Sequence, residues 1–147
     1  YKQNCYMMRK KIMLLVTVMA FLFNGCSIDD DGANFHFTAL EIVEAEVPES
    51  FDLNETYKIS VDYIKPDSCT YYEGFDVVKD SLTVRSVVAI GTVRTDFDDC
   101  TEELIQETAS FNFQVIYDKP YTFKFYTGNN SDGEAEYMEI VVPVNKP

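Results

Sequence analysis

Strict alternation of apolar and polar residues in short segments is the feature that most constrains the fold of this chain. The clearest case covers residues 57–63, which read Tyr-Lys-Ile-Ser-Val-Asp-Tyr. Residues two apart lie on the same face of a β-strand, so one face of this segment is apolar and the other is polar. The pattern predicts a strand that packs one face on a core and exposes the other to water.

Six further segments show strand patterns, and turn residues separate them. The predicted strands are 35–47, 57–63, 69–78, 82–93, 111–115, 121–125 and 138–142. We expect 35–47 to be an edge strand because it is rich in Glu and ends at Pro48, and 82–93 to be central because nearly all of its residues are β-branched or small. The chain is therefore predicted to be all-β, a single antiparallel β-sandwich of about seven strands.

The N-terminal part has a different pattern, that of a secretory signal. Arg9, Lys10 and Lys11 precede an apolar run from Ile12 to Phe23. A helix of this length spans about 18 Å, which is short of the ~30 Å hydrocarbon core of a bilayer. We therefore predict a signal helix in a cleaved signal peptide over residues 1–25, with residues 1–6 upstream of the natural start.

Gly25 and Cys26 directly follow the apolar run and resemble the lipobox of bacterial lipoproteins, whose cysteine is acylated and becomes the mature N-terminus. Phe23 and Asn24 depart from the usual lipobox residues in a way that is similar to the looser lipoboxes of Bacteroidota. The resemblance implies that Cys26 carries diacylglycerol and palmitate and anchors the chain to a membrane.

Asp29, Asp30 and Asp31 come next and resemble the surface-export tag of Bacteroidota lipoproteins. The resemblance implies an outer-membrane protein on the cell surface. A plain solvated spacer also fits these acids, so the periplasmic face of the membrane is the alternative. Residues 26–33 are then an acidic flexible tether, and 34–147 form the sandwich domain.

Charge excludes one class of partner. All 25 acidic residues but only 8 of the 12 basic ones follow the predicted cleavage site, so the mature net charge is 8 − 25 = −17. Such a surface repels the phosphate backbone of nucleic acids, and it also favours a monomer through self-repulsion. Membrane attachment must then come from lipid rather than from a basic patch, which leaves other envelope proteins or glycans as candidate partners.

The cysteine count supports export. If Cys26 is acylated, Cys69 and Cys100 remain as a pair in the mature chain. Disulfides persist in oxidising compartments outside the cytoplasm. We therefore predict a disulfide between Cys69 and Cys100.

The C-terminal segments resemble the last hairpin of immunoglobulin-like and fibronectin-type domains. Pro120-Tyr121 is followed by an alternating strand, a Gly/Asn/Asp turn and a second alternating strand. The resemblance implies that Tyr121 is a corner tyrosine, whose hydroxyl bonds to the backbone a few residues upstream.

Candidate ligand residues are few. A possible surface for calcium or glycans combines exposed tyrosines with an acidic loop: Tyr71, Tyr72, Asp96, Asp98, Asp99, Glu102 and Glu103. Asp80-Ser81-Leu82 resembles a short O-glycosylation acceptor of Bacteroidota, with Ser81 as the modified residue. The chain has a single histidine, His36, between Phe35 and Phe37, so we expect it to point away from the face that these rings fill.

Three functions follow from these observations. The first is a non-catalytic, lipid-anchored protein that binds or braces other components at the outer membrane, with no cofactor, no metal and no catalytic residue. The second is a calcium- or glycan-binding surface module. The third is a small hydrolase that uses acidic residues.

Overall fold

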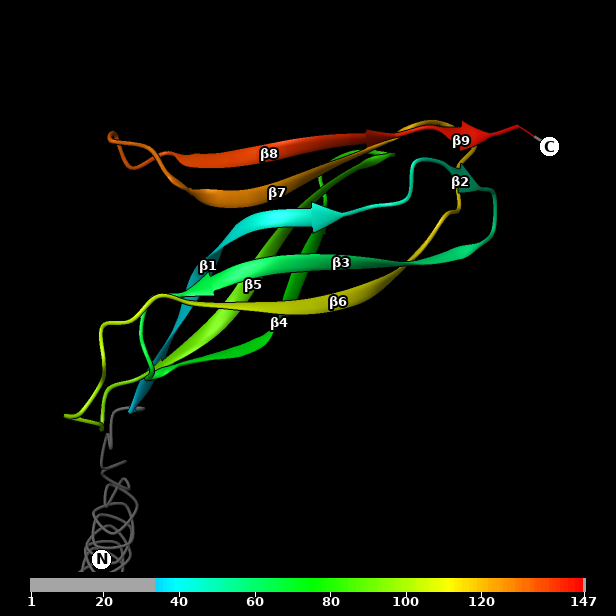
Figure 1. Ribbon diagram of the computed structural model, residues 1–147. Helices are drawn as coiled ribbons and strands as arrows, with labels where there is room; N and C mark the ends of the chain where they lie inside the picture. Colours follow the sequence, from blue (N-terminus) through cyan, green and yellow to red (C-terminus); the bar gives the residue numbers. More distant parts are fainter. Residues whose placement is uncertain (1–33, 147) are drawn as a thin grey trace, which may run out of the picture. The chain divides into compact units, whose positions relative to one another are not determined.

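The computed structural model describes residues 34–146, so the predicted signal peptide, Cys26 and the tether lie outside the described residues. The described chain is all-β. Its strands are β1 (Phe35–Glu46), β2 (Phe51–Asp52), β3 (Thr56–Lys65), β4 (Thr70–Lys79), β5 (Val84–Arg94), β6 (Ile105–Gln114), β7 (Tyr121–Asn129), β8 (Ala135–Val142) and β9 (Val144–Asn145) (Figure 1). Within this part of the chain, no helix has the length and apolar character needed to cross a membrane.

All seven predicted strands are present, and two short ones were not predicted. β2 and β9 have two residues each and pair in parallel. A segment of this length carries no periodic pattern, so alternation could not indicate it.

Seven of the strands form one mixed sheet. Its order is β6-β3-β1-β5-β7-β8, and β4 pairs with β5 in addition. Within this sheet the prediction of a purely antiparallel arrangement is wrong at one pair, because β5 and β7 run parallel over Val84–Val87, and the short pair β2 and β9 is parallel as well. Parallel neighbours need a long crossover connection, and β6 with its two loops supplies one here.

β1 is not the edge strand that its glutamates suggested. Phe35–Leu40 pairs with β5, whereas Glu41–Glu46 pairs with β3, so β1 joins the two groups of strands. Glu44 and Glu46 lie on the exposed face, which lets a charge-rich strand occupy an interior position of the sheet. β5 is central as predicted, since it pairs with β1, β4 and β7.

The core lies between β3 and β6 on one side and β4, β5 and β7 on the other. Aromatic rings meet across it, with Phe113 of β6 at 5.0 Å from Phe123 of β7 and Tyr63 of β3 at 4.8 Å from Tyr72 of β4. Figure 1 shows β3 and β6 crossing in front of β4 and β5. This packing of facing layers is consistent with the predicted β-sandwich.

Tyr121 makes the contact expected of a corner tyrosine. Its ring is fully buried at the start of β7. Its hydroxyl oxygen accepts hydrogen bonds from the backbone N–H groups of Ile116 and Tyr117, both at 3.1 Å. One side chain therefore fixes the turn that leads from β6 into β7.

Removing only this hydroxyl tests its role. Y121F leaves the ring in the core and two backbone N–H groups without an acceptor, so we expect the free energy of unfolding to fall by about 1–3 kcal/mol. The measurement is urea denaturation. The matched control is Y126F, whose hydroxyl bonds the exposed Asn129 side chain and whose loss should stay within about 0.5 kcal/mol. Equal losses in the two variants would contradict the corner assignment.

Candidate functional site

The predicted disulfide is present and fixes one end of the acidic loop. Cys69 and Cys100 are bonded with their Cα atoms 5.5 Å apart. Beside the bond, the Thr101 N–H donates to Ser68 Oγ at 2.9 Å, and the Ser68 N–H donates to the Thr101 carbonyl at 3.2 Å. The loop between β5 and β6 is thereby attached to the chain that enters β4.

Arg94 organises the start of the same loop. Its Nε donates to Asp96 Oδ1 at 3.0 Å and its Nη2 to Oδ2 at 2.5 Å, so the pair is bidentate. The guanidinium also lies over the Phe97 ring, 4.6 Å from the centroid. The hydrogen bonds from Arg94 lower the pKa of Asp96 below its ordinary value. Asp96 is therefore already paired with a cation.

The remaining acids of the predicted surface do not converge. Asp98, Asp99, Glu102 and Glu103 are all exposed along the loop. Among residues 34–146 no three His, Cys, Asp or Glu side chains are placed to hold a metal ion together. This arrangement gives no support to calcium binding at the loop.

Tyr71 and Tyr72 point to opposite faces of β4. Tyr71 is 46% exposed, whereas Tyr72 stacks on Tyr63 with centroids 4.8 Å apart. Burial raises the pKa of Tyr72. Tyr72 therefore belongs to the edge of the core, and only Tyr71 contributes to a surface.

Sequence reasoning missed an aromatic surface at the start of β1. Phe35 and Phe37 are 45% and 67% exposed. Their partners in register are Arg94 and Thr92 on β5, and Tyr71 of β4 lies opposite Thr92 on its other side. Directly opposed residues share a face of the sheet, so these side chains form one outer surface.

His36 lies on the opposite face of β1 from Phe35 and Phe37, as expected. Leu40 and Ile42 are the β1 residues buried in the core, so the core-facing side of β1 includes position 36 and excludes positions 35 and 37. His36 is nevertheless exposed, because β1 starts beyond the end of the core. The Phe-x-Phe spacing was the available signal that the two rings share one face of the strand.

A shallow depression borders this surface. Tyr71, Glu73, Thr92 and Arg94 line a hollow of about 390 Å³. It combines one ring with a carboxylate, a hydroxyl and a guanidinium. Such a lining can stack on one side of a small polar ligand and hydrogen-bond its edges.

Comparison with known protein families, with curated proteins and with solved structures finds no match to this chain. Function is therefore proposed from the sequence together with the geometry of the described residues.

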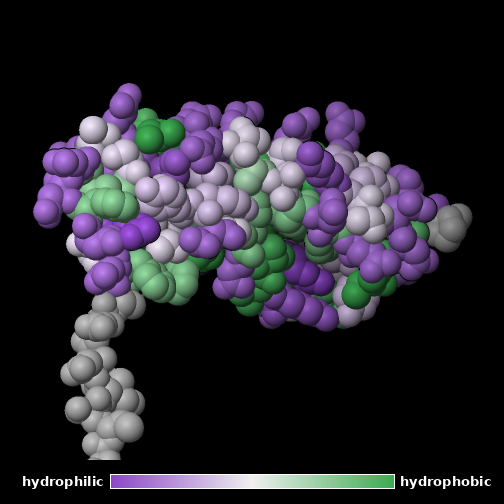
Figure 2. Space-filling model, turned by 90° about the horizontal axis from the view of Figure 1, so that it is seen from below, coloured by the Kyte–Doolittle hydropathy of each residue, from purple (hydrophilic) through white to green (hydrophobic). Residues whose placement is uncertain are grey.

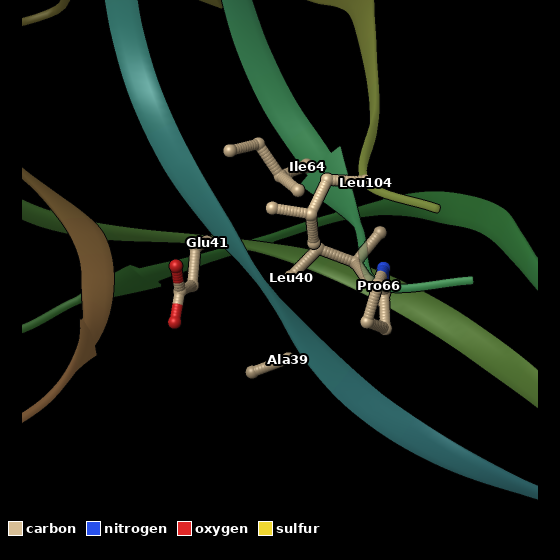
Figure 3. A pocket seen from close by; sticks show the side chains of 6 residues that line it. All are labelled: Ala39, Leu40, Glu41, Ile64, Pro66 and Leu104. Carbon is tan, nitrogen blue, oxygen red and sulfur yellow. The ribbon is translucent and has the colours of Figure 1, made fainter. Parts of the chain in front are cut away.

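A second hollow lies at the end of β3. Its volume is about 160 Å³, and it is lined by Ala39, Leu40, Glu41, Ile64, Pro66 and Leu104. In Figure 3 the Glu41 carboxylate points to the opposite side of β1 from Leu40 and Leu104. The hollow is thus apolar and lies beside the exposed Leu104. None of its lining residues points a polar group into it.

A polar hollow lies on the outer face of β1, β3 and β6. It has a volume of about 510 Å³ and is lined by Glu44, Glu46, Ser60, Asp62 and Thr108. The Asp62 carboxylate accepts hydrogen bonds from Thr108 Oγ1 at 2.6 Å and from Gln106 Nε2 at 3.1 Å. Asp62 is therefore bonded to side chains of the neighbouring strand β6.

Glu107 on the inner side of β6 joins two strands. Its Oε1 lies 2.6 Å from Lys65 Nζ, and its Oε2 accepts a hydrogen bond from the Tyr63 hydroxyl at 3.0 Å. The hydrogen bond from Lys65 is the main cause that lowers the pKa of Glu107 below its ordinary value. Burial and the hydrogen bond to Glu107 raise the pKa of Tyr63, so the phenol stays protonated as the donor.

This contact predicts a difference in acid sensitivity. The lowered pKa means that the folded protein favours charged Glu107, so its contribution is complete above the ordinary carboxyl pKa and is lost as the pH falls through the lowered pKa. We expect wild type to lose more stability on acidification than E107Q. Thermal unfolding against pH measures this, with E102Q in the exposed loop as control. Parallel profiles for wild type and E107Q would contradict it.

Ser81 occupies an exposed turn between β4 and β5. The turn is held from beneath by Arg85, whose Nη1 donates to the carbonyls of Ser81, Leu82 and Val84 at 3.0, 3.3 and 2.9 Å. The Arg85 side chain is buried against the rings of Phe113 and Tyr121. The predicted acceptor is thus presented to solvent on a fixed backbone.

Proposed function

We propose that this chain is a lipid-anchored, non-catalytic protein of the bacterial outer membrane, attached through Cys26 and exposed at the cell surface. Its sandwich domain binds or braces other envelope components. The anchor is a diacylglycerol and palmitate modification of Cys26, and residues 27–33 are the tether.

The observation that carries this proposal is the disulfide between Cys69 and Cys100. A bridge of this kind persists in an oxidising compartment, which supports export from the cytoplasm. The bridge also uses the two other cysteines that follow the predicted cleavage site, so it leaves Cys26 for acylation.

We also propose that the sandwich is of the immunoglobulin or fibronectin type. The hydroxyl of Tyr121 and its two backbone donors support this assignment. The parallel pairing of β5 with β7 is a departure from the purely antiparallel pattern of those domains. A solution structure that places β5 and β7 in separate sheets would favour the assignment.

Two carboxyl groups have the properties of structural rather than catalytic residues. A general acid in glycoside hydrolysis needs a raised pKa. Asp96 and Glu107 have shifted pKa values, and both are lowered by basic partners. These acids are therefore tuned to stay ionised and paired, as structural groups are.

The test of the anchor uses the full chain expressed in a bacterium that acylates lipoproteins. C26A should abolish incorporation of labelled palmitate and release the protein from the membrane fraction. The matched control is S27A, which changes the residue next to Cys26 and should keep full labelling. Labelling of C26A at the wild-type level would overturn the proposal.

A second candidate is a glycan-binding module, and the hollow beside Tyr71 is the observation that favours it. Neutral oligosaccharides fit better than anionic ones, since the mature chain carries 8 − 25 = −17 charges. A bound sugar should raise the melting temperature by mass action, and Y71A should remove the shift. An equal shift in Y71A would place the ligand elsewhere.

A further inference from the structure

Three phenylalanines form an exposed apolar patch at the end of the domain where β1 begins. This phenylalanine patch consists of Phe35, Phe37 and Phe97, which are 45%, 67% and 47% exposed. The first two rings contact each other edge to face at 5.7 Å. Phe35 pairs in register with Arg94, and the Arg94 guanidinium lies over Phe97, so the third ring joins the same surface. Figure 2 shows apolar side chains among hydrophilic ones at this end of the domain.

The patch lies close in sequence to the proposed anchor. Phe35 is 35 − 26 = 9 residues after Cys26. An extended chain spans at most ~3.3–3.6 Å per residue, so Phe35 stays within about 30 Å of an acylated Cys26. The patch is therefore always within reach of the membrane that holds the lipid.

The chemistry of the patch suits lipid better than the other occupants. Phenylalanine has no hydrogen-bonding group with which to select a polar ligand, and Phe is among the apolar side chains that interfacial elements bury at the boundary between headgroups and acyl chains. Arg94 is the cation within the patch, and its pairing with Asp96 leaves the pair neutral. A second copy of the chain would bring together two strongly acidic domains, which repel each other.

We propose that the phenylalanine patch contacts the bilayer and orients the domain on the membrane surface. This rests on the proposed lipid anchor. The lipid must be neutral overall, because Asp98 and Asp99 follow Phe97 in the same loop and would be repelled by anionic headgroups. The anchor supplies attachment, and the patch limits the tilt and rotation of the attached domain.

The chain contains no Trp, so a single Trp reports on one position. The acylated full chain carrying F37W is purified from membranes and reconstituted into phosphatidylcholine vesicles with and without brominated phosphatidylcholine. The control is I116W, because Ile116 is 51% exposed and lies far from the patch. It precedes β7, whose first residues pair with Val84 at the start of β5, whereas Arg94 is the last residue of β5. Circular dichroism checks that both variants keep the β-sheet signal.

We expect brominated lipid to quench F37W several times more strongly than I116W, with blue-shifted emission from F37W. Equal quenching of the two variants would overturn the patch contact. A blue shift without quenching would overturn it too, since it would place a protein rather than lipid on the patch. Recovery of F37W in the membrane fraction distinguishes these results from failure of the anchor, in which case neither variant would be membrane-bound.

Discussion

F123A is expected to lower the free energy of unfolding by about 3–5 kcal/mol, because it opens a cavity in the centre of the core. Phe123 is fully buried. Its ring packs at 5.0 Å from Phe113, 6.0 Å from Phe125 and 6.1 Å from Phe51, so it joins β7 to β6 and β2. A domain of this size has a total stability of about 5–15 kcal/mol, so the loss is a large share of it.

Urea denaturation of the chain from Ser27 onward measures this loss. The matched control is F37A, which makes the same change at a ring that is 67% exposed and should alter stability by less than about 0.5 kcal/mol. Comparable losses of stability in F123A and F37A would contradict the placement of Phe123 in the core and of Phe37 on the surface.

Removing the disulfide is expected to cost about 3–4 kcal/mol in the chain-entropy model. The sequence separation between Cys69 and Cys100 is 31 residues, and closing such a loop removes many conformations from the unfolded chain. The native contacts around Ser68 and Thr101 remain available without the bond. The loss should therefore come mainly from the unfolded state.

The variant C69S/C100S tests this prediction by urea denaturation beside wild type. A reductant should lower wild-type stability to that of the variant and leave the variant unchanged, which makes the variant its own control. Two reactive thiols in wild type purified under oxidising conditions, or a variant as stable as wild type, would contradict the role of the bridge.

Local alternation predicted the strands well because it depends only on burial of one face. Residues 57–63 lie in β3, and Ile59, Val61 and Tyr63 are buried as their spacing requires. The contact of Tyr121 with the preceding turn was also predictable, because a Tyr after Pro at a strand start is a local motif. The disulfide was predictable from the number of cysteines.

Strand pairing and the limits of the core were not predictable from local pattern. The glutamates of β1 suggested an edge, but they lie on an exposed face of an interior strand. Phe35 and Phe37 alternate as core residues do, yet they lie on the outer face. The alternation of apolar and polar residues indicates that a strand has two different faces. Which face is buried depends on the layer of strands that packs against it.

The residues of the predicted ligand surface do not all lie together on the surface, for a related reason. Tyr71 and Tyr72 are adjacent in sequence, but one is exposed and the other stacks on Tyr63. The acids of the β5–β6 loop are close in sequence without meeting in space. Arg94, which holds Asp96 and Phe97 in place, could be identified only once its side-chain contacts were known.

The most direct test of the lipid anchor is the intact mass and N-terminal peptide of the protein isolated from bacterial membranes. We predict a chain that begins at Cys26, with the added mass of a diacylglycerol and a further fatty acyl group on that residue, and with Cys69 and Cys100 oxidised. A membrane-derived chain that retains residues 9–25, or one that begins after Cys26 without lipid, would contradict the account.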